Sequence, residues 1–261
     1  MEILAIYTAL GVVAGLLAGM LGVGGGQVVV PGLLYIFHLK GFAPEIAVHM
    51  ALGTSLATIV VTSFSAAQSH HRRGSLDWPT VRRMTPGIAL GAIVGGLMSS
   101  LFSAHVLRIS FGVFLLILAV QMAFSLKPTP HRSLPGNFGL TVAASSIGWI
   151  SAIVGVGGGS MVVPFLVWCN INVKAAVGTA SACGASLALA GTIGFLISGW
   201  NSIDLPDYTL GYIYLPAWIG ISLCSLLFTP VGALISHRLP ATALKRGFSL
   251  FLAIAGFRIL L

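Results

Sequence analysis

Charged residues are scarce in this sequence. Only 7% of its 261 residues are Asp, Glu, Lys or Arg, whereas 57% are hydrophobic. A soluble domain carries roughly 25% charged residues, so the composition excludes an ordinary soluble protein. It predicts an all-α, multi-pass membrane protein, because helices satisfy their own backbone groups in lipid. The uncharged stretch 3–39 is too long for one crossing, which takes about 20 residues.

Acidic residues are the scarcest of all. There are five, and we place all of them in loops or at the amino terminus: Glu2, Glu45, Asp77, Asp204 and Asp207. Sites for protons and metal cations inside a membrane commonly use buried carboxylates. The sequence therefore argues against a cation substrate. It also argues against an enzyme, since intramembrane aspartyl chemistry needs two acids within the spans.

Cysteine is rare as well, and the three residues Cys169, Cys183 and Cys224 show no metal-type spacing. We expect no metal site and no cofactor. The net charge of +8 comes from basic residues placed between apolar segments, which is typical of positive-inside orientation. Nucleic acid is therefore not an expected partner, and the lipid bilayer is. With no basic region before it, the amino terminus is expected to begin the first span.

Glycine, in contrast, is concentrated in a pattern that occurs twice. Gly22-Val23-Gly24-Gly25-Gly26 is followed by Pro31, and Gly155-Val156-Gly157-Gly158-Gly159 is followed by Pro164. We call residues 22–26 and 155–159 the first and second glycine turns. Four glycines in five positions disfavour a continuous helix, because each costs about 1 kcal/mol relative to alanine. Each turn therefore predicts a helical hairpin that is broken within the membrane.

The duplication continues beyond the glycine turns. Residues 51–55 (Ala-Leu-Gly-Thr-Ser) match residues 176–180 (Ala-Val-Gly-Thr-Ala), and further matches follow at similar spacing. We predict two transmembrane repeats of four to five helical segments each, at 1–126 and 134–261, joined by a linker at 127–133. The helix after the first glycine turn is expected to start at about Gln27, and spans are expected at 84–103 and 208–236.

Charge predicts how the repeats are oriented. The loop after the first Gly-Thr span carries Arg72, Arg73, Arg82 and Arg83, so we place it in the cytoplasm. The equivalent loop in the second repeat carries two aspartates and no basic residue, so we place it outside. Equivalent loops on opposite faces indicate an inverted repeat, which needs an odd number of crossings per half. Two helical segments in each broken hairpin give five.

Paired helix breaks in matching halves are typical of a transporter's binding site. Glycine-rich turns that lead into helices expose backbone N–H groups and the positive ends of helix dipoles, which suit a small anion. The candidate site residues are Gly22, Gly24, Gly25, Gly26, Gln27, Thr54, Ser55, Gly155, Gly157, Gly158, Gly159, Ser160 and Thr179. The glycines could instead serve close packing, and the polar side chains could cap a helix or bond back to the preceding turn.

The paired Gly-x-Gly-Gly-Gly-x-x-x-x-Pro elements and the Gly53-Thr54-Ser55 motif resemble the TauE/SafE family, the sulfite exporter or anion permease proteins. The resemblance covers essentially the whole chain. It implies a carrier in the bacterial inner membrane for sulfite, sulfoacetate or other organosulfonates. Thr179-Ala180-Ser181 departs from the Thr-Ser pair usual in the family. An anion channel, a carrier of another small anion, an intramembrane enzyme and an accessory subunit are the alternatives. The coupling ion, the direction of transport and a homo-oligomeric state stay open.

Overall fold

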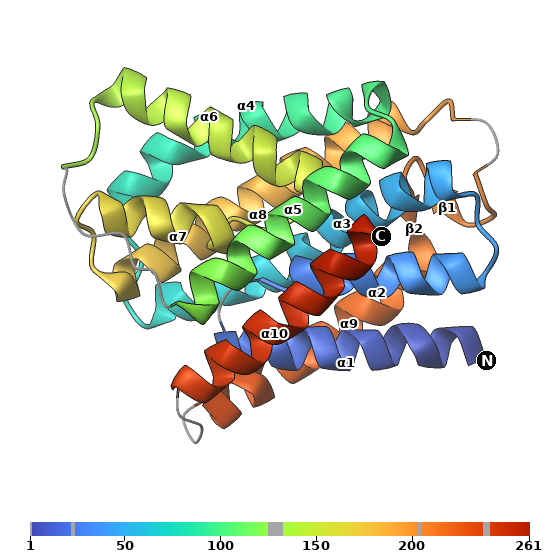
Figure 1. Ribbon diagram of the computed structural model, residues 1–261. Helices are drawn as coiled ribbons and strands as arrows, with labels where there is room; N and C mark the ends of the chain where they lie inside the picture. Colours follow the sequence, from blue (N-terminus) through green and yellow to red (C-terminus); the bar gives the residue numbers. More distant parts are fainter. Residues whose placement is uncertain (1, 22–23, 125–132, 203–204, 237–240) are drawn as a thin grey trace.

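The computed structural model describes residues 2–21, 24–124, 133–202, 205–236 and 241–261 (Figure 1). The prediction of an all-α polytopic membrane protein is confirmed. Six of the described helices are long and apolar enough to cross a membrane. The first half contains the helices α1 (Glu2–Leu21), α2 (Gly26–Leu39), α3 (Pro44–Arg72), α4 (Trp78–Met98) and α5 (Ala104–Ala123), with a short 3-10 turn, η1 (Ser99–Leu101), after α4. The second half contains α6 (Asn137–Val154), α7 (Gly159–Trp168), α8 (Val173–Ser198), α9 (Leu215–Ser236) and α10 (Ala241–Leu260).

Both long uncharged stretches are broken where the glycine turns predict. Helix α2 begins at Gly26, one residue before the predicted start, and α7 begins at Gly159. In Figure 1 α2 runs back along the direction from which α1 came, and α7 does the same after α6. The described residues therefore show a broken helical hairpin at the start of each half. Most of the predicted linker, residues 127–132, lies outside the described residues.

One predicted helical segment is wrong in part. The sequence predicts a span from Tyr208, but residues 209–214 form a small antiparallel pair, β1 (Thr209–Leu210) with β2 (Ile213–Tyr214). Tyr208 and Gly211 have φ angles of 65° and 53°. A right-handed helix cannot continue through left-handed residues, so α9 starts only after the chain has turned back.

Helix α4 begins earlier than its hydrophobicity predicts. The predicted span starts at Met84, with Arg82 and Arg83 in the preceding loop, yet the helix starts at Trp78. The carboxylate of Asp77 caps this end by accepting the N–H three residues along the chain. The two arginines are therefore held on a helix and not in a free loop.

The two halves are interleaved. The first helix of each half packs against the fourth helix of the other half, α1 against α9 and α6 against α4. Small residues allow both contacts: a methyl group added to Gly95 of α4 would lie 2.7 Å from the Trp149 carbonyl oxygen of α6. One added to Gly11 of α1 would lie 2.8 Å from the Ile221 carbonyl oxygen of α9. Such close backbone approach is the usual function of small residues in membrane helices.

Equivalent helices run in opposite directions. In Figure 1 α1 runs from the N label at the right toward the left, whereas α6 runs from left to right. Likewise α10 runs toward the C label at its right-hand end, opposite to α5. In addition α3 packs against α8 and α5 packs against α10, so that these two pairs of equivalent helices are in direct contact.

Candidate functional site

The first glycine turn connects α1 to α2 through a left-handed residue. Gly24 has a φ angle of +81°, and Gly25 then serves as the N-cap of α2. A side chain at Gly24 would be strained, which explains the need for glycine there. Around Gly25 there is room, because the nearest atoms to an added methyl group would be 3.9 Å away. Gly22, a predicted site residue, lies outside the described residues.

The second glycine turn also combines a left-handed glycine with a glycine N-cap, but its left-handed residue is the first of the five and not the third. Gly155 ends α6 with a φ angle of +67°, and Gly158 is the N-cap of α7. The turn is packed more tightly than the first. A methyl group on Gly158 would lie 3.0 Å from the Gly184 Cα of α8, and one on Gly157 would lie 3.1 Å from Ile59 of α3. Both glycines therefore permit close contact with the long central helices.

The two glycine turns meet, although they are far apart in the sequence. The Gln27 side-chain nitrogen Nε2 donates a hydrogen bond of 2.6 Å to the Ser160 hydroxyl, across 133 positions. A methyl group on Gly26 would lie 2.9 Å from the Gly155 carbonyl oxygen. Gln27 is fully buried and Ser160 is 6% exposed. The structure therefore brings together the N-terminal ends of α2 and α7 in the protein interior.

Backbone N–H groups are the main hydrogen-bond donors at this junction. The N–H groups of Gly26, Gln27, Gly159 and Ser160 open the two helices, and among the described residues no acceptor bonds to them. The first N–H groups of a helix have no partner within it, and they carry the positive end of the helix dipole. Two such ends side by side make an electropositive site that suits an anion.

Helix α3 supports the junction with one of the predicted residues. The Ser55 hydroxyl donates a hydrogen bond of 2.9 Å to the Gly155 carbonyl oxygen. This bond joins α3 to the second glycine turn and holds the turn against Gly26. Ala180 occupies the equivalent position in α8 and has no hydroxyl, so the two halves differ here. Ser55 therefore lies at the junction, where its hydroxyl bonds to the protein backbone.

Thr54 and Thr179 are placed elsewhere. The Thr54 hydroxyl oxygen accepts the N–H of Tyr214 at 2.9 Å, and Thr179 accepts the N–H of Asp77 at 3.2 Å. Tyr214 immediately precedes α9 and Asp77 immediately precedes α4. Each threonine thus anchors the start of the fourth helix of the other half. We call these two bonds the threonine anchors.

The glycine before each threonine completes its anchor. A methyl group on Gly53 would lie 2.7 Å from the Tyr212 carbonyl oxygen, and one on Gly178 would contact the Ser75 carbonyl oxygen. Tyr212 and Ser75 each lie two residues before the anchored N–H. The duplicated Gly-Thr motif therefore builds the same backbone contact twice.

Sequence reasoning missed several residues that form or support the site. Ile59 of α3 contacts the second glycine turn, and Gly184 at the equivalent position of α8 contacts Gly158. Neither is distinguished in the sequence from its apolar neighbours. His49 is buried near the start of α3, with Nδ1 2.8 Å from the Glu45 carbonyl oxygen and Nε2 3.1 Å from that of Ser99. It connects α3 to the end of α4 and has no contact with either glycine turn among the described residues.

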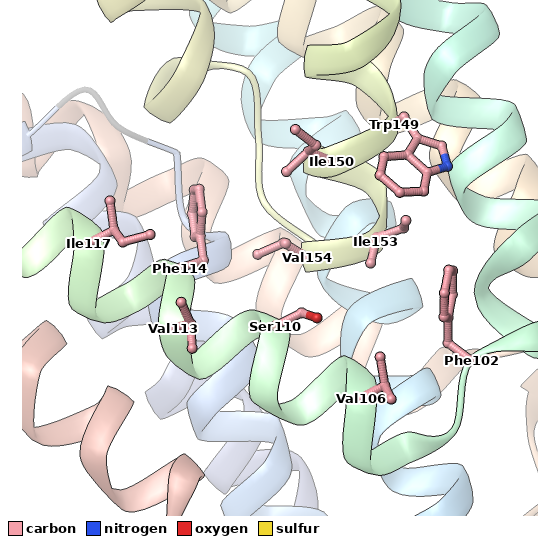
Figure 2. Close-up of a pocket in the computed structure, with 10 residues that line it drawn as sticks. All are labelled: Phe102, Val106, Ser110, Val113, Phe114, Ile117, Trp149, Ile150, Ile153 and Val154. Atoms are coloured by element: carbon pink, nitrogen blue, oxygen red, sulfur yellow. The ribbon is translucent and has the colours of Figure 1, made fainter.

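A separate groove of about 290 Å³ lies between α5 and α6 (Figure 2). Its lining is almost wholly apolar, with Phe114, Ile117 and Trp149 among the side chains that point toward it. Ser110 supplies the one hydroxyl among the labelled residues. An anion would lose its hydration there without replacement donors, so the groove is unsuited to the chemistry of the glycine turns.

The fold is that of a multi-pass helical membrane protein, and two broken hairpins that meet in its interior are typical of transporters. The model of the sulfite exporter TauE/SafE family matches residues 7–259, and the chain belongs to this family. It is similar to a probable membrane transporter protein of Haemophilus influenzae, with 38% identity over 259 residues that cover 96% of each chain. A probable membrane transporter protein of Methanocaldococcus jannaschii is 25% identical over 263 residues, covering 99% of this chain and 96% of the relative. YunE of Bacillus subtilis, also a probable membrane transporter protein, is 25% identical over 215 residues, covering 74% of this chain and 78% of its own. The chain is thus a multi-pass integral membrane protein, and the predicted location in a bacterial inner membrane fits these relatives.

Proposed function

We propose that this protein carries small sulfur-containing anions, such as sulfite or organosulfonates, by alternating access at the two glycine turns. The observation that carries the proposal is the direct contact between the turns. The Gln27–Ser160 hydrogen bond places two helix N-termini side by side in a buried position. The name of the family supplies the sulfur chemistry.

Electrostatics favours an anion over a cation at this junction. A helix N-terminus carries the equivalent of about half a positive charge, so α2 and α7 both attract a negative ligand. The described residues include no buried Asp or Glu side chain that could offset that potential. In a dry interior such fixed dipoles act more strongly than in water. Gly26, Gln27, Gly159 and Ser160 are the residues we assign to anion contact through their N–H groups.

The arrangement of the two halves supports alternating access. Equivalent helices that run in opposite directions fit an inverted repeat, in which the two halves can exchange conformations. The threonine anchors lie at the starts of α4 and α9, one on each exchanging half. Movement of one fourth helix relative to its anchor would open the junction to one side of the membrane at a time.

Flux through purified protein in liposomes tests this proposal. We expect saturable uptake of at least one anion among sulfite, thiosulfate, sulfate and simple organosulfonates, with counterflow when the liposomes are preloaded. Flux without saturation or counterflow would indicate a channel. Absence of flux for all of these anions, from protein that is folded and inserted, would reject the proposed substrate class.

A further inference from the structure

One polar atom of the Gln27 amide has no partner in the part of the chain that the structure describes. The amide nitrogen bonds to Ser160, but the amide oxygen Oε1 is buried and has no hydrogen-bond partner among the described residues. Buried polar atoms in native proteins are nearly always paired, and an unpaired one costs about 1–3 kcal/mol. An unpaired acceptor at the meeting point of two helix N-termini indicates a ligand with a donor of its own.

The inventory of donors and acceptors at the junction is uneven. Four backbone N–H groups, those of residues 26, 27, 159 and 160, have no acceptor among the described residues. The Ser160 oxygen accepts from Gln27, so its own hydroxyl hydrogen is free to donate. Among the buried side-chain atoms of the described residues at this junction, Gln27 Oε1 is the acceptor without a partner. A matching ligand has several acceptor oxygens and a single donor hydrogen.

This inference rests on the proposed function and deepens it. From the inventory we infer that, when sulfite is the substrate, the protein carries its protonated form, hydrogensulfite, and that the O–H group of hydrogensulfite donates to Gln27 Oε1. The dianion would turn a lone pair toward the amide oxygen and leave Oε1 unpaired. A metal cation would satisfy Oε1, but the positive ends of α2 and α7 oppose it. Hydrogensulfite has both the negative charge that the helix N-termini favour and the donor hydrogen that Oε1 lacks.

The ionisable side chains on the helices that pack against α2 and α7 form no hydrogen bond with the Gln27 side-chain amide among the described residues. They include Tyr7 of α1, His49 of α3, Lys174 and Cys183 of α8, and Arg258 of α10. His49 faces the Glu45 and Ser99 carbonyl oxygens, and Arg258 lies over the Tyr35 ring. None of them hydrogen-bonds to Gln27 or Ser160 among the described residues. The dependence on pH therefore belongs to the substrate.

The test is exchange of labelled sulfite by the full-length protein in liposomes, at one total concentration and equal pH on both sides. The pH series crosses the second ionisation of sulfurous acid, near neutrality. We expect wild-type exchange to follow the hydrogensulfite concentration and to fall at least about tenfold at the alkaline end. Gln27→Met keeps the size of the side chain but removes the acceptor, so its preference for the protonated form should shrink about tenfold or more.

Methanesulfonate tests whether the pH dependence comes from the substrate or from the protein. It keeps a single negative charge and has no acidic proton across this pH range. Its exchange should vary little with pH in both proteins. Wild-type exchange that follows the sulfite dianion, or methanesulfonate exchange that falls in parallel with sulfite exchange, would overturn the inference. So would an unchanged pH preference in Gln27→Met. If Gln27→Met does not fold, the two wild-type profiles still test whether hydrogensulfite is the form of sulfite that is carried. Absence of exchange for every sulfur anion at every pH would reject the proposed function itself.

Discussion

At the scale of single residues, neighbouring glycines in one turn have different tasks. Gly26 lies where a methyl group would come within 3.1 Å of the Ser55 hydroxyl and 2.9 Å of the Gly155 carbonyl oxygen. Its hydrogen is what lets the two turns touch. Gly25 has φ and ψ angles of −76° and −14°, and a methyl group added there would make only ordinary van der Waals contacts, at 3.9 Å. Neither the backbone angles nor crowding by neighbouring atoms requires glycine at this position. The absence of a side chain here therefore needs another reason, such as room for the substrate.

We predict that Gly25→Ala lowers anion flux at least about tenfold while leaving the protein folded. The added methyl group meets no atom closer than 3.9 Å, and replacing glycine at a compatible backbone position commonly stabilises a protein by about 0.4–1 kcal/mol. Flux in liposomes and thermal unfolding in detergent measure the two effects. Gly247→Ala is the matched control, because Gly247 lies on the exposed side of α10 with nothing within 4 Å. Normal flux in Gly25→Ala would show that the space beside Gly25 is not used by the substrate.

At the scale of elements, the duplicated Gly-Thr motif connects helices of opposite halves. The glycine admits the backbone that precedes a fourth helix, and the threonine accepts the N–H at its start. A hydroxyl in this position fixes where α4 or α9 begins. The motif is therefore placed to hold the frame around the glycine turns.

The second prediction separates this anchoring role from direct contact with the substrate. Thr54→Val keeps the shape but leaves the Tyr214 N–H without its acceptor, which should lower stability by about 1–3 kcal/mol. Thr179→Val should cost less, because Asp77 is less buried than Tyr214. Thr141→Val serves as control, since its exposed hydroxyl bonds only back to Asn137 within α6. Unfolding in denaturant measures the effect. Unchanged stability with a loss of flux in Thr54→Val would assign that hydroxyl to the substrate.

At the scale of the whole molecule, the two halves do not form separate bodies. Each contributes its first helix to a seam with the fourth helix of the other, so the junction between the glycine turns is enclosed by both. The opposite directions of equivalent helices place the α3–α4 loop and the segment after α8 at opposite ends of the molecule (Figure 1). This arrangement predicts that these two segments lie on opposite sides of the membrane.

We predict that Arg73→Cys and Asp207→Cys, each in a cysteine-free background, react from opposite sides of the membrane. Both positions are exposed. A membrane-impermeant maleimide applied to intact cells should label Asp207→Cys, and Arg73→Cys should react only after the membrane is opened. Background variants lacking Cys169, Cys183 and Cys224 provide the baseline. Labelling of both positions from the same side would contradict the inverted arrangement.

Much of the architecture follows from composition and glycine placement. The four to five helical segments in each half and the breaks before Gly26 and Gly159 could be predicted, because glycine penalties and hydrophobic length act locally. The β1–β2 pair could not, since it depends on left-handed backbone at Tyr208, a residue with no such signal. The early start of α4 could not be predicted from hydropathy either, because hydropathy marks only the apolar part of a helix and the first turns of α4 are polar.

The candidate site divides in the same way. The glycine turns and the polar residues after them were identified from their repetition, and the amide-to-hydroxyl bond between Gln27 and Ser160 joins them. The task of Thr54 could not be foreseen, because its partner Tyr214 is 160 positions away. The contacts of Ile59 and Gly184 are likewise set by which helices lie side by side.

By itself, the sequence determined that this chain spans a membrane in two similar halves, each interrupted by glycine, and that it brings almost no negative charge into the interior. Those properties are sums of local terms: transfer of side chains into lipid, the helix cost of glycine, and the placement of basic residues. The tertiary structure alone decided that the interruptions face each other, that one amide oxygen there has no partner among the described residues, and that the threonines bond to the starts of helices. These depend on atoms more than a hundred positions apart, and only packing brings such atoms within reach of each other.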